Sequence, residues 1–443
     1  MPFVVTQGSG AESLASTGSL EMVPRNCGLA DYKKIRNIPT FQVTGDLIAY
    51  ASPDSTYAVT RRLLDAAQKE IIIGIYDFSA DYIKEILLNA IRRGVKVSLM
   101  LDIDGRQEEK LFEELEKFGC AGVHAPSCAS KVISYFPSSH EKVIVIDGKW
   151  TLVQSGNYSK NSIPFNEKDG DPANFVKGNR DMGVAIRSRP LATFFANLLR
   201  SDMKLELDAE APEALGRRIR RKKEPDLVEA VPELLPPKLF PSKTFNPSGA
   251  IKVMPVLTPD NYLAVIPDLL ESAKRSIYIE NQYIRSKHAE ITKLLAAIKK
   301  ARDNKPELVV RIILGKLFGM DDFEKEKVNV ANLKMKFGLI LDKNLRYIDT
   351  KRFVHCHNKL IIVDEEAVLI SSQNWSNTGV GNNREAGVLI RYPAIAQYYS
   401  EIFESDWGTA LKKIPKPGRG TVEPEALATG KFVEVSAADY QEV

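Results

Sequence analysis

The stretch HEKVIVIDGKWTLVQSGN, residues 140–157, decides the fold of this 443-residue chain because it occurs twice. The second copy, HNKLIIVDEEAVLISSQN, occupies residues 357–374, which is 217 positions later. Five residue types recur at identical spacing: His140, Lys142, Asp147, Ser155 and Asn157 in the first copy, and His357, Lys359, Asp364, Ser372 and Asn374 in the second. The chain has only five histidines, and two imidazoles brought together can serve one reaction as nucleophile and general acid.

Each copy is predicted to form a β-hairpin. The β-branched run at 143–146 is typical of a strand, and Asp147 followed by glycine is typical of a two-residue turn. With that turn Ile146 pairs with Lys149, and counting back places Ser155 opposite His140. Because strand side chains alternate, the lysine and asparagine of the motif share the histidine's face. The second copy predicts the same register.

These residue types suit a phosphate group. Lysine, asparagine and serine can donate to its oxygens, and donors fixed in advance stabilise the negative charge of a pentacoordinate phosphorus. A neutral imidazole can attack an anionic phosphodiester and form a phosphohistidine, while a protonated imidazole gives a proton to the leaving alcohol. An aspartate in an Asp-Gly turn is more typical of a structural residue, yet Asp147 and Asp364 stay among the catalytic candidates.

No metal or cofactor is expected. No carboxylate cluster suited to Mg²⁺ or Ca²⁺ stands beside the motifs, so we expect the lysines to supply the positive charge. His355 and His357 would share a strand face, but Ser138 occupies the equivalent of His355 in the first copy, which argues against a metal pair. His355 can still line the pocket, whereas His124 and His288 are expected to be structural or surface residues.

The similarity of the halves extends beyond the motifs. Turns at 52–54 and 258–260 each precede a helical pattern and a buried strand, and residues 194–202 match 398–406 as closing helices. The alternation of helices and strands predicts an α/β fold with mostly parallel or mixed sheets. The expected organisation is a flexible N-terminal segment (1–40), a first lobe (41–205), a Pro-rich basic linker (206–249), a second lobe (250–410) and a C-terminal tail (411–443).

Composition describes an ordinary globular protein, with 44% hydrophobic and 27% charged residues. The net charge of +4 is mild and gives no strong indication of nucleic-acid binding. Four cysteines show no spacing typical of disulfides or zinc, which favours a reducing compartment. No signal peptide or membrane-spanning run is evident, so we expect a cytoplasmic protein that associates at most peripherally with a membrane.

The residues resemble the phospholipase D superfamily, which is known for paired H-x-K-x(4)-D motifs. The family's following G-S/G-x-N element corresponds to residues 154–157 and 371–374, although its first position, usually glycine, is Gln154 and Ser371 here. A later N-x-E element is similar to residues 179–181 and 383–385, with Asp181 in place of glutamate and Glu385 as usual. The resemblance covers roughly residues 43 to 407.

This resemblance implies two similar lobes, each a mixed sheet flanked by helices, related by a pseudo-twofold axis with both motifs at one active site. It implies His140 as the nucleophile and His357 as the general acid, with Asp181 and Glu385 supporting the motif histidines. The first lobe has 13 more residues between its asparagine and its acid than the second. This insertion, Ile163–Lys177, is expected either to gate the substrate or to form a plain surface excursion.

The leading functional prediction is a metal-independent phosphodiesterase or phosphatidyltransferase that acts on phospholipid at a membrane surface. One alternative is a cardiolipin synthase-like transferase, whose bacterial members typically carry N-terminal membrane helices. Another is a nuclease, which the mild charge disfavours. A binding module without catalysis is disfavoured because both motifs are complete. No obligate protein partner is evident from the sequence.

Overall fold

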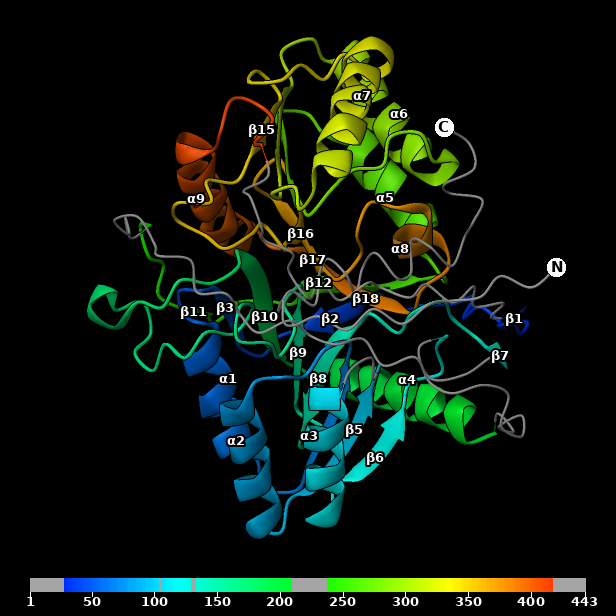
Figure 1. The fold of residues 1–443 in the computed structure, drawn as a ribbon, viewed down its shortest axis with the longest axis vertical. Helices are drawn as coiled ribbons and strands as arrows, with labels where there is room; N and C mark the ends of the chain where they lie inside the picture. Colours follow the sequence, from blue (N-terminus) through cyan, green and yellow to red (C-terminus); the bar gives the residue numbers. More distant parts are fainter. Residues whose placement is uncertain (1–27, 103–105, 129–132, 209–236, 417–443) are drawn as a thin grey trace, which may run out of the picture.

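A computed structural model of the chain describes residues 28–102, 106–128, 133–208 and 237–416. Two mixed sheets of eight strands each occupy the centre of this described part, one in each lobe (Figure 1). The prediction of two similar α/β lobes is therefore confirmed. Much of the expected N-terminal segment, linker and tail lies outside the described residues, including the basic run between residues 217 and 223.

Both sheets have the same strand order, element for element. The first-lobe sheet runs β11 (Lys243–Phe245), β3 (Leu47–Ser52), β10 (Asp181–Arg187), β9 (Trp150–Gln154), β8 (Lys142–Ile146), β4 (Glu70–Ile75), β5 (Lys96–Leu101) and β6 (Ala121–His124). The second-lobe sheet, in the matching order, runs β2 (Phe41–Val43), β12 (Ile251–Thr258), β18 (Glu385–Arg391), β17 (Ala367–Ser371), β16 (Lys359–Val363), β13 (Ser276–Asn281), β14 (Val309–Leu314) and β15 (Leu345–Tyr347). A short separate sheet pairs β1 (Gly28–Leu29) with β7 (Ile133–Ser134).

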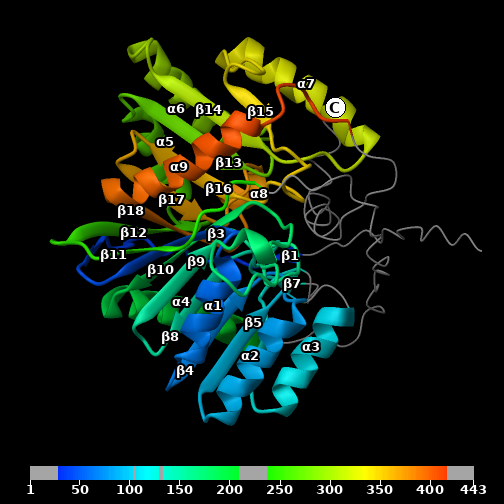
Figure 2. The ribbon, with the colours of Figure 1, turned by 90° about the vertical axis from the view of Figure 1, so that its left-hand side faces the viewer.

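Helices cover both faces of each sheet, which explains why the central strands are continuous apolar runs rather than alternating ones. The outer faces pack against α1 (Thr56–Asp65), α2 (Asp81–Arg92) and α3 (Arg106–Lys117) in the first lobe, and against α5 (Tyr262–Glu271), α6 (Ala289–Asn304), α7 (Met320–Phe337) and α8 (Asn377–Gly381) in the second. The first group lies in the lower half of Figure 2 and the second in the upper half.

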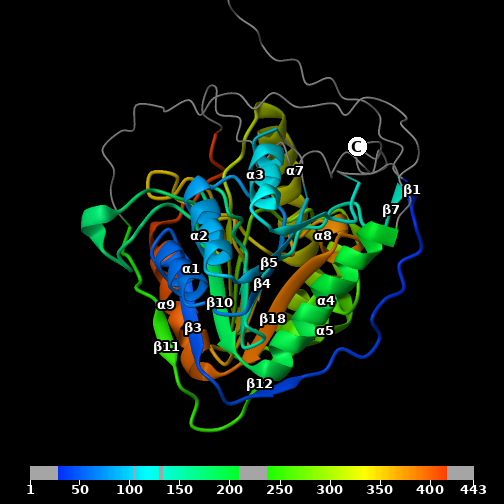
Figure 3. The same cartoon turned by 90° about the horizontal axis from the view of Figure 1, so that it is seen from below.

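The inner faces of the two sheets share one hydrophobic core. It includes the closing helices α4 (Arg189–Asp208) and α9 (Pro393–Thr409), which lie on opposite sides of the central strands (Figure 3). Phe195 and Leu199 of α4 belong to the same buried cluster as Tyr399 and Phe403 of α9. The lobes are therefore packed as one body, because burying this shared apolar surface stabilises their association.

The first strand of each half pairs with the sheet of the other half. The β2 strand, in the segment expected to begin the first lobe, is antiparallel to β12 of the second lobe. The β11 strand, in the segment expected as a linker, is antiparallel to β3 of the first lobe. Each half thus completes one edge of its partner's sheet.

The hairpins form as predicted, but their register differs by one residue. Ile146 pairs with Trp150 rather than with Lys149, because the loop has three residues and begins with Asp147 at φ 53°. In the second copy Val363 pairs with Ala367 around a matching three-residue loop. The predictions that each serine lies directly opposite its own histidine are therefore wrong.

The cysteines also correct an expectation. Cys120 and Cys356 are free and buried, but Cys128 is disulfide-bonded. The spacing of the four cysteines did not indicate this bond. Within the described ranges, no helix is both long and apolar enough to span a membrane.

Candidate active site

The two motifs meet at the contact between the lobes. The residue before each motif histidine lies beside the residue before the acid of the other lobe, which is Glu385 or Asp181. Arg384 pairs with Ser139 in a parallel bridge, and the backbone N–H of His140 donates to the carbonyl of Arg384 at 2.7 Å. The equivalent bridge joins Arg180 to Cys356, and the N–H of His357 donates to the carbonyl of Arg180 at 3.0 Å. These backbone contacts place each motif histidine beside the acid of the other lobe.

Each motif histidine is held by that acid. His140 Nδ1 lies 2.8 Å from Glu385 Oε2, and His357 Nδ1 lies 3.0 Å from Asp181 Oδ1. All four side chains are buried. A carboxylate on Nδ1 fixes the orientation of the ring and leaves Nε2 for chemistry.

The motif serines support these acids rather than standing opposite their own histidines. Ser155 Oγ donates to Asp181 Oδ1 at 2.7 Å, and Ser372 Oγ donates to Glu385 Oε2 at 2.5 Å. Each serine therefore acts on the histidine of the other lobe through the acid between them. The serines were expected to bind phosphate, but in this structure their hydroxyls are engaged with carboxylates.

The motif lysines lie beside their histidines and are buried. Lys142 Nζ donates to the carbonyl of His140 at 2.6 Å and lies 5.1 Å from the centre of the Tyr76 ring. Lys359 Nζ donates to the carbonyl of His357. Positive charge that is held in place within a buried site suits a phosphate anion.

Among the ten residues that recur at identical spacing, three polar atoms are buried without a hydrogen-bond partner in the described part of the chain. They are Nε2 of His140 and the amide oxygens of Asn157 and Asn374. Buried polar atoms that lack a protein partner are typical of a site that is completed by a ligand. Nε2 of His140 is the atom that the nucleophile assignment requires.

Burial and the two lysines set the charges of the first histidine and its acid. Burial, reinforced by Lys142 and Lys359, lowers the pKa of His140 well below its ordinary 6.5. Burial also raises the pKa of Glu385 to about 8, although Lys142 opposes this change. The pKa of Lys142 is lowered to about 7, chiefly by burial. The His140 imidazole is therefore held in its neutral form.

The acid beside His357 differs in charge from the acid beside His140. Burial tends to raise the pKa of Asp181, but the His357 and Lys359 side chains outweigh burial and lower this pKa below its ordinary value. Asp181 is therefore ionised and can stabilise a protonated His357 imidazole. The two pairs match the roles of a neutral nucleophile and a charged general acid.

The motif aspartates lie at the hairpin turns and not with the histidines. Asp147 Oδ1 accepts hydrogen bonds from the backbone amides of Lys69 at 2.7 Å and Glu70 at 3.0 Å. Asp364 makes the same contacts with the amides of residues 274–276. The five-residue strand β8 separates Asp147 from the site by roughly 16 Å, at about 3.3 Å per residue. Both aspartates tie their hairpin to the start of the neighbouring strand.

We expect Asp147→Ala to lower the free energy of unfolding by about 1–3 kcal/mol without changing the chemical step, because it leaves backbone amides without their charged acceptor. Burial raises the pKa of Asp147, but the amides outweigh it and lower the pKa overall, so this stabilisation is present at neutral pH and is lost in acid. Urea denaturation and kcat measure the two effects, with Asp364→Ala as the matched variant. Loss of kcat at unchanged stability would instead place Asp147 in the chemistry.

Two buried arginines, which no sequence motif indicated, hold the lobes together at the site. Arg180 Nη1 lies 2.8 Å from Asp54 Oδ1 of its own lobe, and Arg180 Nε lies 2.7 Å from Asp406 Oδ2 of the other lobe. Arg384 is paired in the same way, at 2.8 Å each, with Asp260 and Asp202. The signal was present in the sequence, because these aspartates occupy matching positions in the repeated turns and closing helices.

The first-lobe insertion, Ile163–Lys177, is anchored to both lobes. Tyr82 Oη donates to the carbonyl at the start of the insertion at 2.6 Å. At its other end the lysine Nζ donates to the carbonyl of Thr350 in the second lobe, also at 2.6 Å. The alternative roles of gate and plain surface excursion stay predictions.

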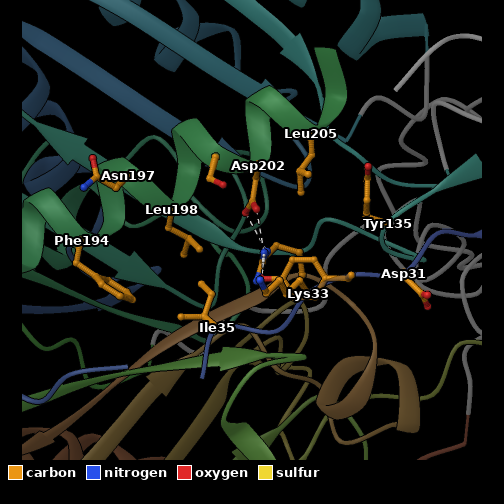
Figure 4. Close-up of a pocket in the computed structure, with 12 residues that line it drawn as sticks. Asp31, Lys33, Ile35, Tyr135, Phe194, Asn197, Leu198, Asp202 and Leu205 are labelled. Carbon is orange, nitrogen blue, oxygen red and sulfur yellow. Dashed lines mark hydrogen bonds and ion pairs between the residues drawn. The ribbon is translucent and has the colours of Figure 1, made fainter. Parts of the chain in front are cut away.

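A separate pocket of about 480 Å³ lies between the segment at residues 31–35 and helix α4 (Figure 4). Asp202 and Arg384 line it, together with apolar side chains such as Phe194 and Leu198. None of the twelve predicted site residues lines this pocket. Within the described ranges there is also no group of three or more His, Cys, Asp or Glu side chains that could hold a metal ion.

Comparison with known proteins places both halves in one family. The family described as "Cardiolipin synthase, PLD-like domain" matches residues 60–203 and 266–407, which together form more than half of the chain. No curated protein sequence matches the chain.

Two of the matching solved structures have a similar fold over most of the chain. Phosphatidylserine synthase from Haemophilus influenzae Rd KW20 has a TM-score of 0.56 at 15% identity, over 91% of this chain and 96% of that one. Polyphosphate kinase from Porphyromonas gingivalis has a TM-score of 0.50 at 15% identity, over 90% of this chain and 56% of that one. Nuc from Salmonella typhimurium, a phospholipase D family member, has a TM-score of 0.30 at 22% identity, over 36% of this chain and 96% of that one.

Proposed function

The chain belongs to the phospholipase D superfamily, and from that membership we propose that it is a metal-independent phosphodiesterase of phospholipase D type that acts on phospholipids. The observation that carries the proposal is the crossed pairing of His140 with Glu385 and of His357 with Asp181. Two buried lysines beside these pairs supply positive charge for a phosphodiester anion.

The proposed reaction has two steps. His140 Nε2 bonds to phosphorus while the bond between phosphorus and the alcohol oxygen breaks, and His357 gives its proton to that oxygen. Water or a second alcohol then bonds to phosphorus as the bond to Nε2 breaks, and His357 takes the proton of the attacking group. Lys142 and Lys359 stabilise the charge on the phosphoryl oxygens in both steps. Water yields hydrolysis, and an alcohol yields phosphatidyl transfer.

Transfer to an alcohol is the second candidate. It is favoured by the family description, which names cardiolipin synthase, and by the likeness in fold to a phosphatidylserine synthase. The chemistry of the site is the same for both outcomes, since only the group that attacks the phosphohistidine differs. We propose peripheral contact with a lipid surface.

A side-by-side assay tests the proposal. The protein is offered phosphatidylcholine with ethanol, phosphatidylglycerol alone, and single-stranded DNA, each with EDTA present. We expect phosphatidic acid and phosphatidylethanol from the first mixture, and cardiolipin from the second if transfer dominates. His140→Asn protein purified in parallel controls for contaminating enzymes. Cleavage of DNA without any lipid product would overturn the lipid assignment.

The rate should follow a narrow bell-shaped curve with its maximum near neutral pH. The His140–Glu385 pair must lose one proton before Nε2 can attack, so kcat/KM rises with pH towards the Glu385 pKa of about 8. Lys142, whose pKa is lowered to about 7, loses its charge over an overlapping range, so kcat/KM falls again at higher pH and the maximum is narrow. The two apparent pKa values of the curve belong to the interacting groups together and not to single residues. They can be measured with bis(p-nitrophenyl) phosphate, which is a soluble substrate.

Two matched variants identify the group whose loss of a proton makes kcat/KM rise on the acid side of this curve, its acid limb. Glu385→Gln should move it to lower pH, because the group that loses the proton is removed. Asp181→Asn should lower the rate but leave the limb in place, because the pKa of Asp181 is already low. Equal movement of the limb in both variants would contradict the assignment of this proton to the His140–Glu385 pair.

A further inference from the structure

His355 lies beside the general acid. It stands two residues before His357, and the bridge between Cys356 and Arg180 holds this segment in an extended conformation. Side chains two positions apart on an extended segment face the same way, so both imidazoles lie on one side and Cys356 on the other. His355 is only 1% exposed, and the charges of His357 and Lys359 act on its ring.

The His355 ring is fixed with a proton on Nε2. The backbone N–H of Lys316 donates to Nδ1 at 3.1 Å, so Nδ1 is an acceptor and the hydrogen of the neutral ring is on Nε2. Burial keeps the ring neutral by lowering its pKa well below 6.5. Gly315 makes room for the ring, because a Cβ there would lie 2.2 Å from Cε1. Phe318 packs against the ring at 5.0 Å between centres.

The donor on Nε2 has no hydrogen-bond partner among the described residues. Burying a donor without an acceptor is unfavourable, so an orphaned N–H that is seated this firmly indicates an acceptor brought by a ligand. The catalytic role of His357 does not use this atom. His355 therefore presents a fixed hydrogen-bond donor for a ligand on the side of the site where His357 lies.

The first lobe has a different arrangement at the same positions. Ser138 is the counterpart of His355, and its Oγ donates to Asp102 Oδ2 at 3.2 Å. Asp102 directly follows β5, and Gly315 occupies the matching position after β14. The first lobe therefore has a hydrogen-bonded serine and aspartate at the two positions where the second lobe has His355 and Gly315. The halves therefore differ beside their catalytic histidines, and the donor that lacks a partner among the described residues is on the side of His357.

We propose that His355 is a specificity-determining residue whose Nε2–H binds a second oxygen on the alcohol half of the substrate. This inference rests on the proposed function, in which the alcohol leaves and enters on the side of His357. A vicinal diol places an oxygen next to the reacting one, whereas a simple alcohol does not. The site thus favours headgroups that carry a hydroxyl beside the phosphoester oxygen.

Two phosphatidyl esters that differ by one hydroxyl test the proposal: those of 1-propanol and of the primary hydroxyl of 1,2-propanediol, in mixed micelles. Alcohol release measures kcat/KM for either hydrolysis or transfer. We expect the wild-type protein to favour the diol ester about tenfold. His355→Phe should bring this ratio near one, because it keeps an aromatic ring but removes the donor. His355→Gln, which restores an N–H, should recover part of the preference.

Gly315→Ala is an independent variant, because its Cβ displaces the ring, and it should lower the ratio in the same direction. Ser138→Ala is the matched change in the other lobe and should leave the ratio unchanged. Equal wild-type rates on both esters, or a tenfold preference that survives in His355→Phe, would overturn the role of His355 while leaving the proposed function standing. Cleavage of neither ester would overturn the proposed function, and the inference with it.

Discussion

His140→Asn is expected to reduce turnover by at least about 10⁴-fold while the protein stays folded, because the change removes the atom that attacks phosphorus. The side chain is buried against Glu385 and Tyr76, and asparagine is smaller and uncharged, so the surrounding packing should survive. Steady-state kcat with bis(p-nitrophenyl) phosphate measures the loss. An unchanged thermal midpoint would show that the fold is intact.

The matched variant His357→Asn separates the two roles. p-Nitrophenol leaves readily without a proton, so a protein that lacks only the general acid should still form the phosphohistidine. We expect His357→Asn to release about one p-nitrophenol per chain in a burst and then to turn over slowly, and His140→Asn to give no burst. The opposite result, with the burst confined to His140→Asn, would exchange the assigned roles. Substantial steady-state activity in His140→Asn would show that His140 is not the nucleophile.

Arg180→Ala is expected to lower the free energy of unfolding by about 3–5 kcal/mol. Its guanidinium is buried between Asp54 and Asp406, so removing it leaves two buried carboxylates without their cation. It also removes an ion pair that joins the lobes and the ring contact with Phe353 at 4.3 Å. Urea denaturation measures the change.

Arg200→Ala supplies the control, because Arg200 forms its ion pair with Glu70 at an exposed surface. That variant should lose less than about 1 kcal/mol, as exposed pairs contribute little. Arg180→Lys should recover only part of the loss, since an ammonium cannot reproduce the forked contacts of a guanidinium. A loss for Arg180→Ala as small as that for Arg200→Ala would contradict the role assigned to this buried arginine.

The sequence predicted the parts of the site that depend on local structure. Hydrophobic patterning was sufficient to predict β8 and β9, and the equal spacing of the repeat was sufficient to relate His140 to His357. The register failed because each hairpin loop has three residues instead of two, so that Ile146 pairs with Trp150 and Val363 with Ala367. Such a change depends on the contacts that the aspartate makes with another turn, and these are not local.

The crossed pairs could not be predicted in the same way. The acids Asp181 and Glu385 were expected to support a motif histidine, but the sequence does not say in which lobe that histidine lies. The choice follows from the bridges at Arg180 and Arg384, which form only when the lobes pack together. The residues that hold this packing, such as Asp54 and Asp406, have the same spacing in both halves, yet nothing local indicates that they contact an arginine.

The reciprocal exchange of β2 and β11 makes the chain resemble a domain-swapped dimer whose two subunits have been fused. A half separated from its partner would present a bare strand edge, at β3 or at β12, which is a template for unwanted pairing with other chains. It would also lack the acid for its only motif histidine. The two halves are therefore constrained to change together during evolution, because a substitution in one alters the sheet and the histidine of the other.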